Sequence, residues 1–94
     1  MSLVRKMKEI LTILSEECAE VIQASSKLQR FGTNDERNQK KLEAEIGDLM
    51  AMILILNYYG MVSEEEIMKQ VKSKLKKLKR YSSIKCLDDI IKNL

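Results

Sequence analysis

Turn-forming residues are scarce in this chain, which contains no proline and only three glycines among its 94 residues. Lys, Glu, Leu, Ile and Met are abundant instead, and these residues favour helices over the turns that a sheet requires. A chain of this length buries only about 60–65% of its unfolded surface, so a partner copy would help to complete its core. We therefore predict an all-α fold in a single domain, residues 1–94, completed by self-association.

Apolar periodicity and capping residues predict three long helices and a short fourth helix. Their predicted ranges are Leu3 to Leu28, Glu36 or Asn38 to Tyr59, Ser63 (as the N-cap) to Tyr81, and Leu87 to Leu94. Phe31 and Gly32 begin the first loop, because glycine suits the positive φ of a helix C-terminus. The later half of the second helix is apolar nearly all round and must be covered on more than one side. Since the first connection is short, we predict an antiparallel helical bundle that dimerisation completes.

Missing residue types exclude several kinds of chemistry. The chain has no histidine, so it has neither a histidine general base nor a histidine-ligated metal. Cys18 and Cys86 are too few for a thiolate zinc site, and we interpret them as packing residues in a reducing compartment. The longest apolar run, Leu49 to Leu56, is far shorter than the ~20 residues that span a bilayer. We predict a cytoplasmic protein that does not bind membranes.

Charge is divided unevenly along the chain. Residues 1–66 carry eight basic and twelve acidic side chains, a net charge of −4, whereas residues 67–94 carry nine basic and two acidic side chains, a net charge of +7. An acidic region is therefore followed by a basic one.

Four acidic residues depart from the pattern of a solvated helix face. Glu17 falls inside the apolar arc of the first helix and Glu20 lies at its edge, while Glu45 and Asp48 share the apolar stripe of the second helix. Antiparallel packing would bring the two pairs together, and burying unpaired ions costs several kcal/mol each. A hard divalent cation held by oxygen ligands, Mg²⁺ first and Mn²⁺ second, would offset that cost. For one glutamate alone, pairing with a lysine in solvent is the better interpretation, but two matched inward pairs favour a metal.

The acidic residues also form a known motif. Glu16-Glu17-Cys18-Ala19-Glu20, followed after a spacer by Glu45-Ile46-Gly47-Asp48, resembles the EExxE…ExxD signature of MazG-like nucleoside triphosphate pyrophosphohydrolases. The resemblance covers Leu11 to Tyr81. It implies hydrolysis of a nucleoside triphosphate between the α and β phosphates by an enzyme that is at least a dimer, and here a homodimer or tetramer.

The resemblance further implies a catalytic metal site made by Glu17, Glu20, Glu45 and Asp48. Glu20 or Glu45 would accept the proton of the attacking water. Gly47, which lacks a side chain, would let the first helix approach closely; the alternative is a simple weakness in helix propensity.

Substrate contacts are expected from basic and aromatic residues. Lys74 and Lys77 lie nearest the apolar arc of the third helix and, with Lys27, are candidates for binding phosphate. Phe31, beside Arg30, could enclose a base, although a core or loop-anchoring role is equally consistent. Solvated lysines that only aid solubility are the alternative for Lys74 and Lys77.

Two other functions fit parts of the sequence. The Lys69 to Arg80 cluster could bind nucleic acid through phosphates, but that function leaves the inward acids unexplained. A non-catalytic oligomerisation module, in which the acids meet lysines of a partner, is the third possibility. The enzyme is the favoured prediction, with no nucleic-acid partner expected.

Overall fold

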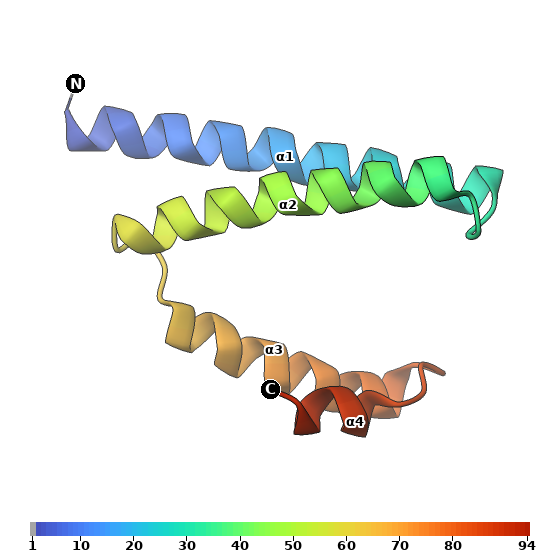
Figure 1. Ribbon diagram of the computed structural model, residues 1–94. Helices are drawn as coiled ribbons and strands as arrows, with labels where there is room; N and C mark the ends of the chain where they lie inside the picture. The colour runs from blue at the N-terminus through green and yellow to red at the C-terminus, as the bar shows by residue number, and fades with distance from the viewer. Residues whose placement is uncertain (1) are drawn as a thin grey trace. The chain divides into compact units, whose positions relative to one another are not determined.

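The computed structural model describes residues 2–94, and within that range it contains helices and no strands (Figure 1). The four helices are α1 (Leu3–Phe31), α2 (Glu36–Tyr58), α3 (Glu64–Tyr81) and α4 (Leu87–Lys92). The predicted all-α class is confirmed. None of the helices in residues 2–94 is both long enough and apolar enough to cross a bilayer.

The end of α1 lies three residues later than predicted. Phe31 is the last residue of the helix, and Gly32 caps it with a φ of 107°. The Gly32 N–H donates to the Leu28 carbonyl at 3.0 Å, so the last helical turn includes the residues between them. The helix continues until the residue that can leave helical geometry at little cost, which is why assigning Phe31 to the loop was wrong.

Short polar side chains begin α2 and α3. The Asp35 carboxylate accepts a hydrogen bond from the Asn38 N–H at 3.0 Å, and the Ser63 hydroxyl accepts one from the Glu66 N–H at 3.4 Å. Each bond satisfies a backbone donor that the first helical turn leaves without a partner. The predicted starts of both helices are thus confirmed.

The chain forms two compact units. One comprises the described residues up to Met61 and the other comprises Val62–Leu94. In the first unit, α1 and α2 run antiparallel, side by side, joined by the loop that starts at Gly32 (Figure 1). Its core is small, and the most buried apolar side chains are Ile10, Ala24, Met52 and Leu56.

The second unit packs the short α4 against α3. Leu87 is buried, and the Lys79 ammonium lies 2.7 Å from the Asp88 carboxylate. Among the residues of α3 itself none is fully buried. This unit therefore has a thinner core than the α1–α2 hairpin.

A row of apolar side chains on α2 is exposed within the single chain. Ile46, Met50, Leu54 and Tyr58 follow one another at intervals of four residues, and Leu54 is 69% exposed. Residues four apart lie on one face of a helix, so these four form a continuous stripe. We call it the α2 apolar stripe.

Both cysteines are free and exposed. Interpreting Cys18 and Cys86 as packing residues was therefore wrong for the single chain. Apolar periodicity suggested burial of Cys18, but its side chain is exposed to solvent in the hairpin.

Candidate metal centre

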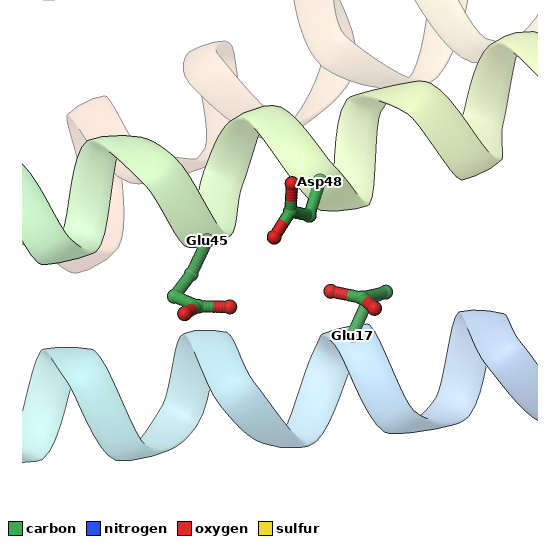
Figure 2. A group of neighbouring side chains, drawn as sticks. All are labelled: Glu17, Glu45 and Asp48. Carbon is green, nitrogen blue, oxygen red and sulfur yellow. The ribbon is translucent and has the colours of Figure 1, made fainter.

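Three carboxylates converge between α1 and α2. Glu17 extends from α1, and Glu45 and Asp48 extend from α2 toward it (Figure 2). One oxygen of each side chain lies within 4.8 Å of an oxygen of the other two. The three-residue spacing of Glu45 and Asp48 places both on the face of α2 that packs against α1. We call these three residues the acidic cluster.

The cluster is buried at one end and open at the other. Glu45 is 6% exposed and is the only buried charged residue in the described chain, Glu17 is partly buried, and Asp48 is exposed. A buried carboxylate is costly unless it is paired or bound to a cation. The exposed Asp48 leaves the cluster accessible from solvent.

Lys41 provides the pairing for the buried carboxylate. Its Nζ lies 2.8 Å from Glu45 Oε1, and the lysine side chain itself is 55% exposed. This hydrogen bond, together with the negative charge of Glu45, raises the pKa of Lys41. Lys41 was not among the predicted site residues, although its i,i+4 spacing from Glu45 was a usable signal.

Negative charge crowds around Glu17. Partial burial raises its pKa above the ordinary value of 4.5, and the charges of Asp48 and Glu45 raise it further, followed by those of Glu20 and Glu16. Each of these effects disfavours the ionised form of Glu17 in the absence of a cation. The site thus has a deficit of positive charge despite Lys41.

Glu20 is not part of the acidic cluster. Its side chain is exposed, and its oxygens are not among those that meet within 4.8 Å. Its charge still acts on both Glu17 and Lys41. The structure thus brings three of the four predicted acids together, and a ligand role for Glu20 stays a prediction.

The ligand types and spacing suit a hard divalent cation. Mg²⁺ binds carboxylate oxygens at about 2.1 Å, so two oxygens on one ion lie about 3–4 Å apart. The observed separations, up to 4.8 Å, are slightly wider than this range. Three carboxylates without imidazole or thiolate favour Mg²⁺ or Mn²⁺ over zinc. Glu17, Glu45 and Asp48 could therefore hold such an ion.

A pocket of about 840 Å³ lies beside the acidic cluster, at the loop end of the hairpin. Lys27 and Phe31, two predicted substrate contacts, line it, as does Lys41. The Arg30 guanidinium lies 5.5 Å from the centre of the Phe31 ring, within range of a cation–π contact. Because Lys41 also pairs with Glu45, this pocket borders the cluster. We call it the basic pocket.

The remaining predicted substrate residues belong to the second unit. Lys74 lines a mostly apolar depression with Val71 and Leu75, and Lys77 lines a smaller one with Lys76 and Arg80. Both lysines are exposed. Their part in binding substrate stays a prediction.

The missing side chain of Gly47 does not face α1 at close range. A Cβ atom built at this position would meet nothing within 4 Å. Gly47 is exposed, whereas Glu45 and Asp48 extend toward α1 (Figure 2). The expectation that a missing side chain at Gly47 brings the acid pairs together was therefore wrong within one chain.

Comparison with known proteins complements this geometry. Neither the curated proteins nor the solved structures contain a match to the chain. Residues 5–81 match the family described as the MazG nucleotide pyrophosphohydrolase domain, and this range includes the acidic cluster and most of the chain. The predicted family is confirmed: the chain belongs to the MazG nucleotide pyrophosphohydrolase family.

Proposed function

We propose that this protein is a Mg²⁺-dependent pyrophosphohydrolase that cleaves ribo- or deoxyribonucleoside triphosphates between the α and β phosphates. The products are a nucleoside monophosphate and pyrophosphate. Family membership supports nucleotide hydrolysis in general. The convergence of Glu17, Glu45 and Asp48 is the observation that supports the metal-dependent mechanism.

In this proposal Glu17, Glu45 and Asp48 hold the cation. Glu20 is near enough for its charge to act on Glu17, and it would add to the attraction for the cation. Bound Mg²⁺ would neutralise phosphate charge and lower the pKa of a water molecule. Lys41 holds the buried Glu45 in a defined position, which limits the reorganisation needed for binding. Glu20 or Glu45 would accept the proton, and Glu20 is the better placed for exchange with solvent because it is exposed.

Pyrophosphate release from a panel of NTPs and dNTPs tests the activity directly. We expect a product mixture of monophosphate and pyrophosphate that appears only with Mg²⁺ or Mn²⁺. Release of orthophosphate in its place would contradict cleavage between the α and β phosphates. Glu43→Gln is a suitable control for the acidic residues, because Glu43 is an exposed acid on α2 outside the cluster.

The whole chain, residues 1–94, is proposed to act as one domain in a homodimer or tetramer whose helices complete a bundle. The α2 apolar stripe supports this assembly, since covering it would remove several large apolar side chains from water. Leu54→Lys should shift the protein toward monomer in sedimentation experiments. Ile84→Lys, at an exposed apolar position outside α2, is the matched control. A wild-type monomer would contradict the proposed assembly.

The two alternatives give different results. Binding to duplex DNA that declines steeply with salt, without pyrophosphate release, would identify a nucleic-acid-binding module. Calorimetry that detects no Mg²⁺ or Mn²⁺ site would favour a non-catalytic oligomerisation module. A cytoplasmic location stays a prediction of the sequence.

A further inference from the structure

Positive charge is concentrated in the basic pocket. Its lining combines the last turns of α1 with the first turns of α2, and both elements belong to the same unit. The charged lining residues are five cations and one acid, namely Lys27, Arg30, Arg37, Lys40, Lys41 and Asp35. Arg37, Lys40 and Lys41 were not among the predicted substrate residues. Only the folded hairpin places them opposite Lys27 and Arg30.

Little of this positive charge is compensated within the chain. The single acid, Asp35, already uses one carboxylate oxygen to accept the Asn38 N–H at the start of α2. Within residues 2–94, Lys27, Arg37 and Lys40 form no ion pair with an acidic side chain, whereas Lys41 is paired with Glu45. The pocket therefore presents cationic groups that lack a partner and are available to an anion.

The chemistry of these cations indicates the kind of anion. Guanidinium and ammonium groups bind phosphate oxygens through charge-assisted hydrogen bonds, and arginine can do so with two parallel bonds. A nucleobase is uncharged and would gain little from several cations around it. A group with several negative charges, such as a polyphosphate, matches the pocket better.

Lys41 connects the pocket to the acidic cluster. It lines the pocket and lies 2.8 Å from Glu45, so a ligand that occupies the pocket reaches the edge of the cluster. A nucleoside triphosphate has a flexible phosphate chain that can extend across such a boundary. The acidic cluster would then be next to the α phosphate, where the proposed reaction takes place.

We infer that the basic pocket holds the β and γ phosphates of the substrate, with Arg37 and Lys40 as phosphate-binding residues. The identity of the ligand rests on the proposed function, whereas the preference for an anion rests on the cationic residues that line the pocket. The Arg30–Phe31 contact would keep the guanidinium in place at the pocket wall.

The test uses inorganic tripolyphosphate and the full-length protein in the presence of Mg²⁺. Arg37→Ala/Lys40→Ala should weaken tripolyphosphate binding at least about tenfold in calorimetry, as expected when charge-assisted hydrogen bonds are lost. The KM for an NTP should rise by a similar factor, while the affinity for the corresponding monophosphate and for Mn²⁺ stays unchanged. Arg5→Ala/Lys8→Ala removes the same charges from exposed positions of α1 and is the matched control.

The outcomes separate this inference from the proposed function. If the Arg37/Lys40 variant binds tripolyphosphate as tightly as the wild type, the inference is overturned whatever the hydrolytic activity. A variant that loses monophosphate affinity alone would place the nucleoside monophosphate part of the substrate in the pocket and would equally overturn the inference. If the variant loses tripolyphosphate but the wild type hydrolyses no NTP, the polyphosphate site is supported and the proposed hydrolysis fails. Arg37→Gln and Lys40→Gln, made singly, preserve the test if the double variant does not fold.

Discussion

The α1–α2 hairpin and the α3–α4 unit use charged residues in opposite ways. In the hairpin, side chains from two helices bring three carboxylates within 4.8 Å of one another, and one of them is buried. In the second unit, charged side chains are exposed, and the ion pairs include those of Lys69 with Glu65 and Glu66 and the Lys79–Asp88 pair. Exposed pairs of this kind contribute about 0–1 kcal/mol each.

The charge of α3 reflects its amino-acid composition, whereas the charge of the acidic cluster reflects the packing of two helices. The basic residues of α3 lie in solvent, where water screens them and like charges are tolerated. The acidic cluster is shielded in part from water, so its members raise the pKa of Glu17 and require a positive partner. The basic residues of the second unit would attract an anion through their charge alone, whereas the proposed metal site in the hairpin would bind its cation through carboxylates at defined distances.

The strongest test of this contrast removes one buried ligand. Glu45→Gln should reduce turnover by more than about 100-fold, because even residues that only support metal ligands are often worth 10–100-fold. Glu43→Gln, the exposed neighbour, should retain wild-type turnover. Initial rates of pyrophosphate release measure both. Retained activity in Glu45→Gln would remove the acidic cluster from the mechanism.

Stability should depend on the hairpin core. Leu56 is 4% exposed, so Leu56→Ala should lower the free energy of unfolding by about 2–5 kcal/mol through lost contacts and a cavity. Leu54, on the exposed side of the same helix, is the matched comparison, and Leu54→Ala should cost much less in a monomer. Urea denaturation followed by circular dichroism measures both changes. A larger loss for Leu54→Ala at high protein concentration would indicate that the α2 apolar stripe is buried in an oligomer.

Lys41 should matter most when no metal is present. Lys41→Gln leaves Glu45 buried without its partner, so the melting temperature of the metal-free protein should fall. Added Mn²⁺ should raise the melting temperature of Lys41→Gln more than it raises that of the wild type, because the ion replaces the missing positive charge. Equal stabilisation of both proteins by Mn²⁺ would argue against an ion next to Glu45.

The raised pKa of Glu17 predicts a pH dependence of stability. Since this pKa is higher in the folded protein than its ordinary value of 4.5, the folded state binds the proton more tightly than the unfolded state. The Glu17 contribution therefore increases stability as the pH falls through the folded pKa toward 4.5, and it is unfavourable at higher pH. Metal-free Glu17→Gln should melt at a higher temperature than the wild type at neutral pH.

Glu17→Gln should also flatten the pH dependence of the melting temperature between pH 4.5 and the folded pKa of Glu17. Glu16→Gln, one residue earlier on the exposed side of α1, is the control and should change it less. An unchanged pH profile in Glu17→Gln would contradict the crowding of charge at Glu17.

The smallest effect is expected in the second unit. If Lys74 and Lys77 assist substrate binding, Lys74→Ala/Lys77→Ala should raise the KM for an NTP about threefold to tenfold, as expected for one or two exposed charge contacts. Lys72→Ala/Lys76→Ala makes the same change in charge at neighbouring exposed positions of α3. Equal KM values for the two double variants would mean that these lysines serve solubility alone.

Much of the local structure could be predicted from the sequence. Asp35 and Ser63 identify the starts of α2 and α3 because a short polar side chain satisfies backbone donors only a few residues away. The end of α1 was placed too early, since apolar periodicity stops at Leu28 while the backbone remains helical until Gly32 allows a turn. Capping hydrogen bonds join residues only a few positions apart, so the sequence is enough to predict them. The error at the end of α1 is no longer than a single helical turn.

The site was less completely predictable. Helical spacing identified inward positions for Glu17 and the two acids of α2, but it grouped Glu20 with them because angular position alone does not fix which oxygens meet. The pairing of Lys41 with Glu45 had a recognisable i,i+4 signal. The basic pocket had none, because its walls come from residues on two helices that meet only after the hairpin forms.

The sequence by itself determined the helices, their capping residues, the acidic motif and the MazG family, because periodicity, hydrogen-bonding groups and motif spacing all act over short distances along the chain. Only the tertiary structure decided which carboxylates share a site, that Lys41 neutralises the buried Glu45, and that Arg37 and Lys40 line a pocket beside it. The reason is physical: electrostatic interactions and burial depend on the distances between side chains in space, and those distances are set by how α1 and α2 pack.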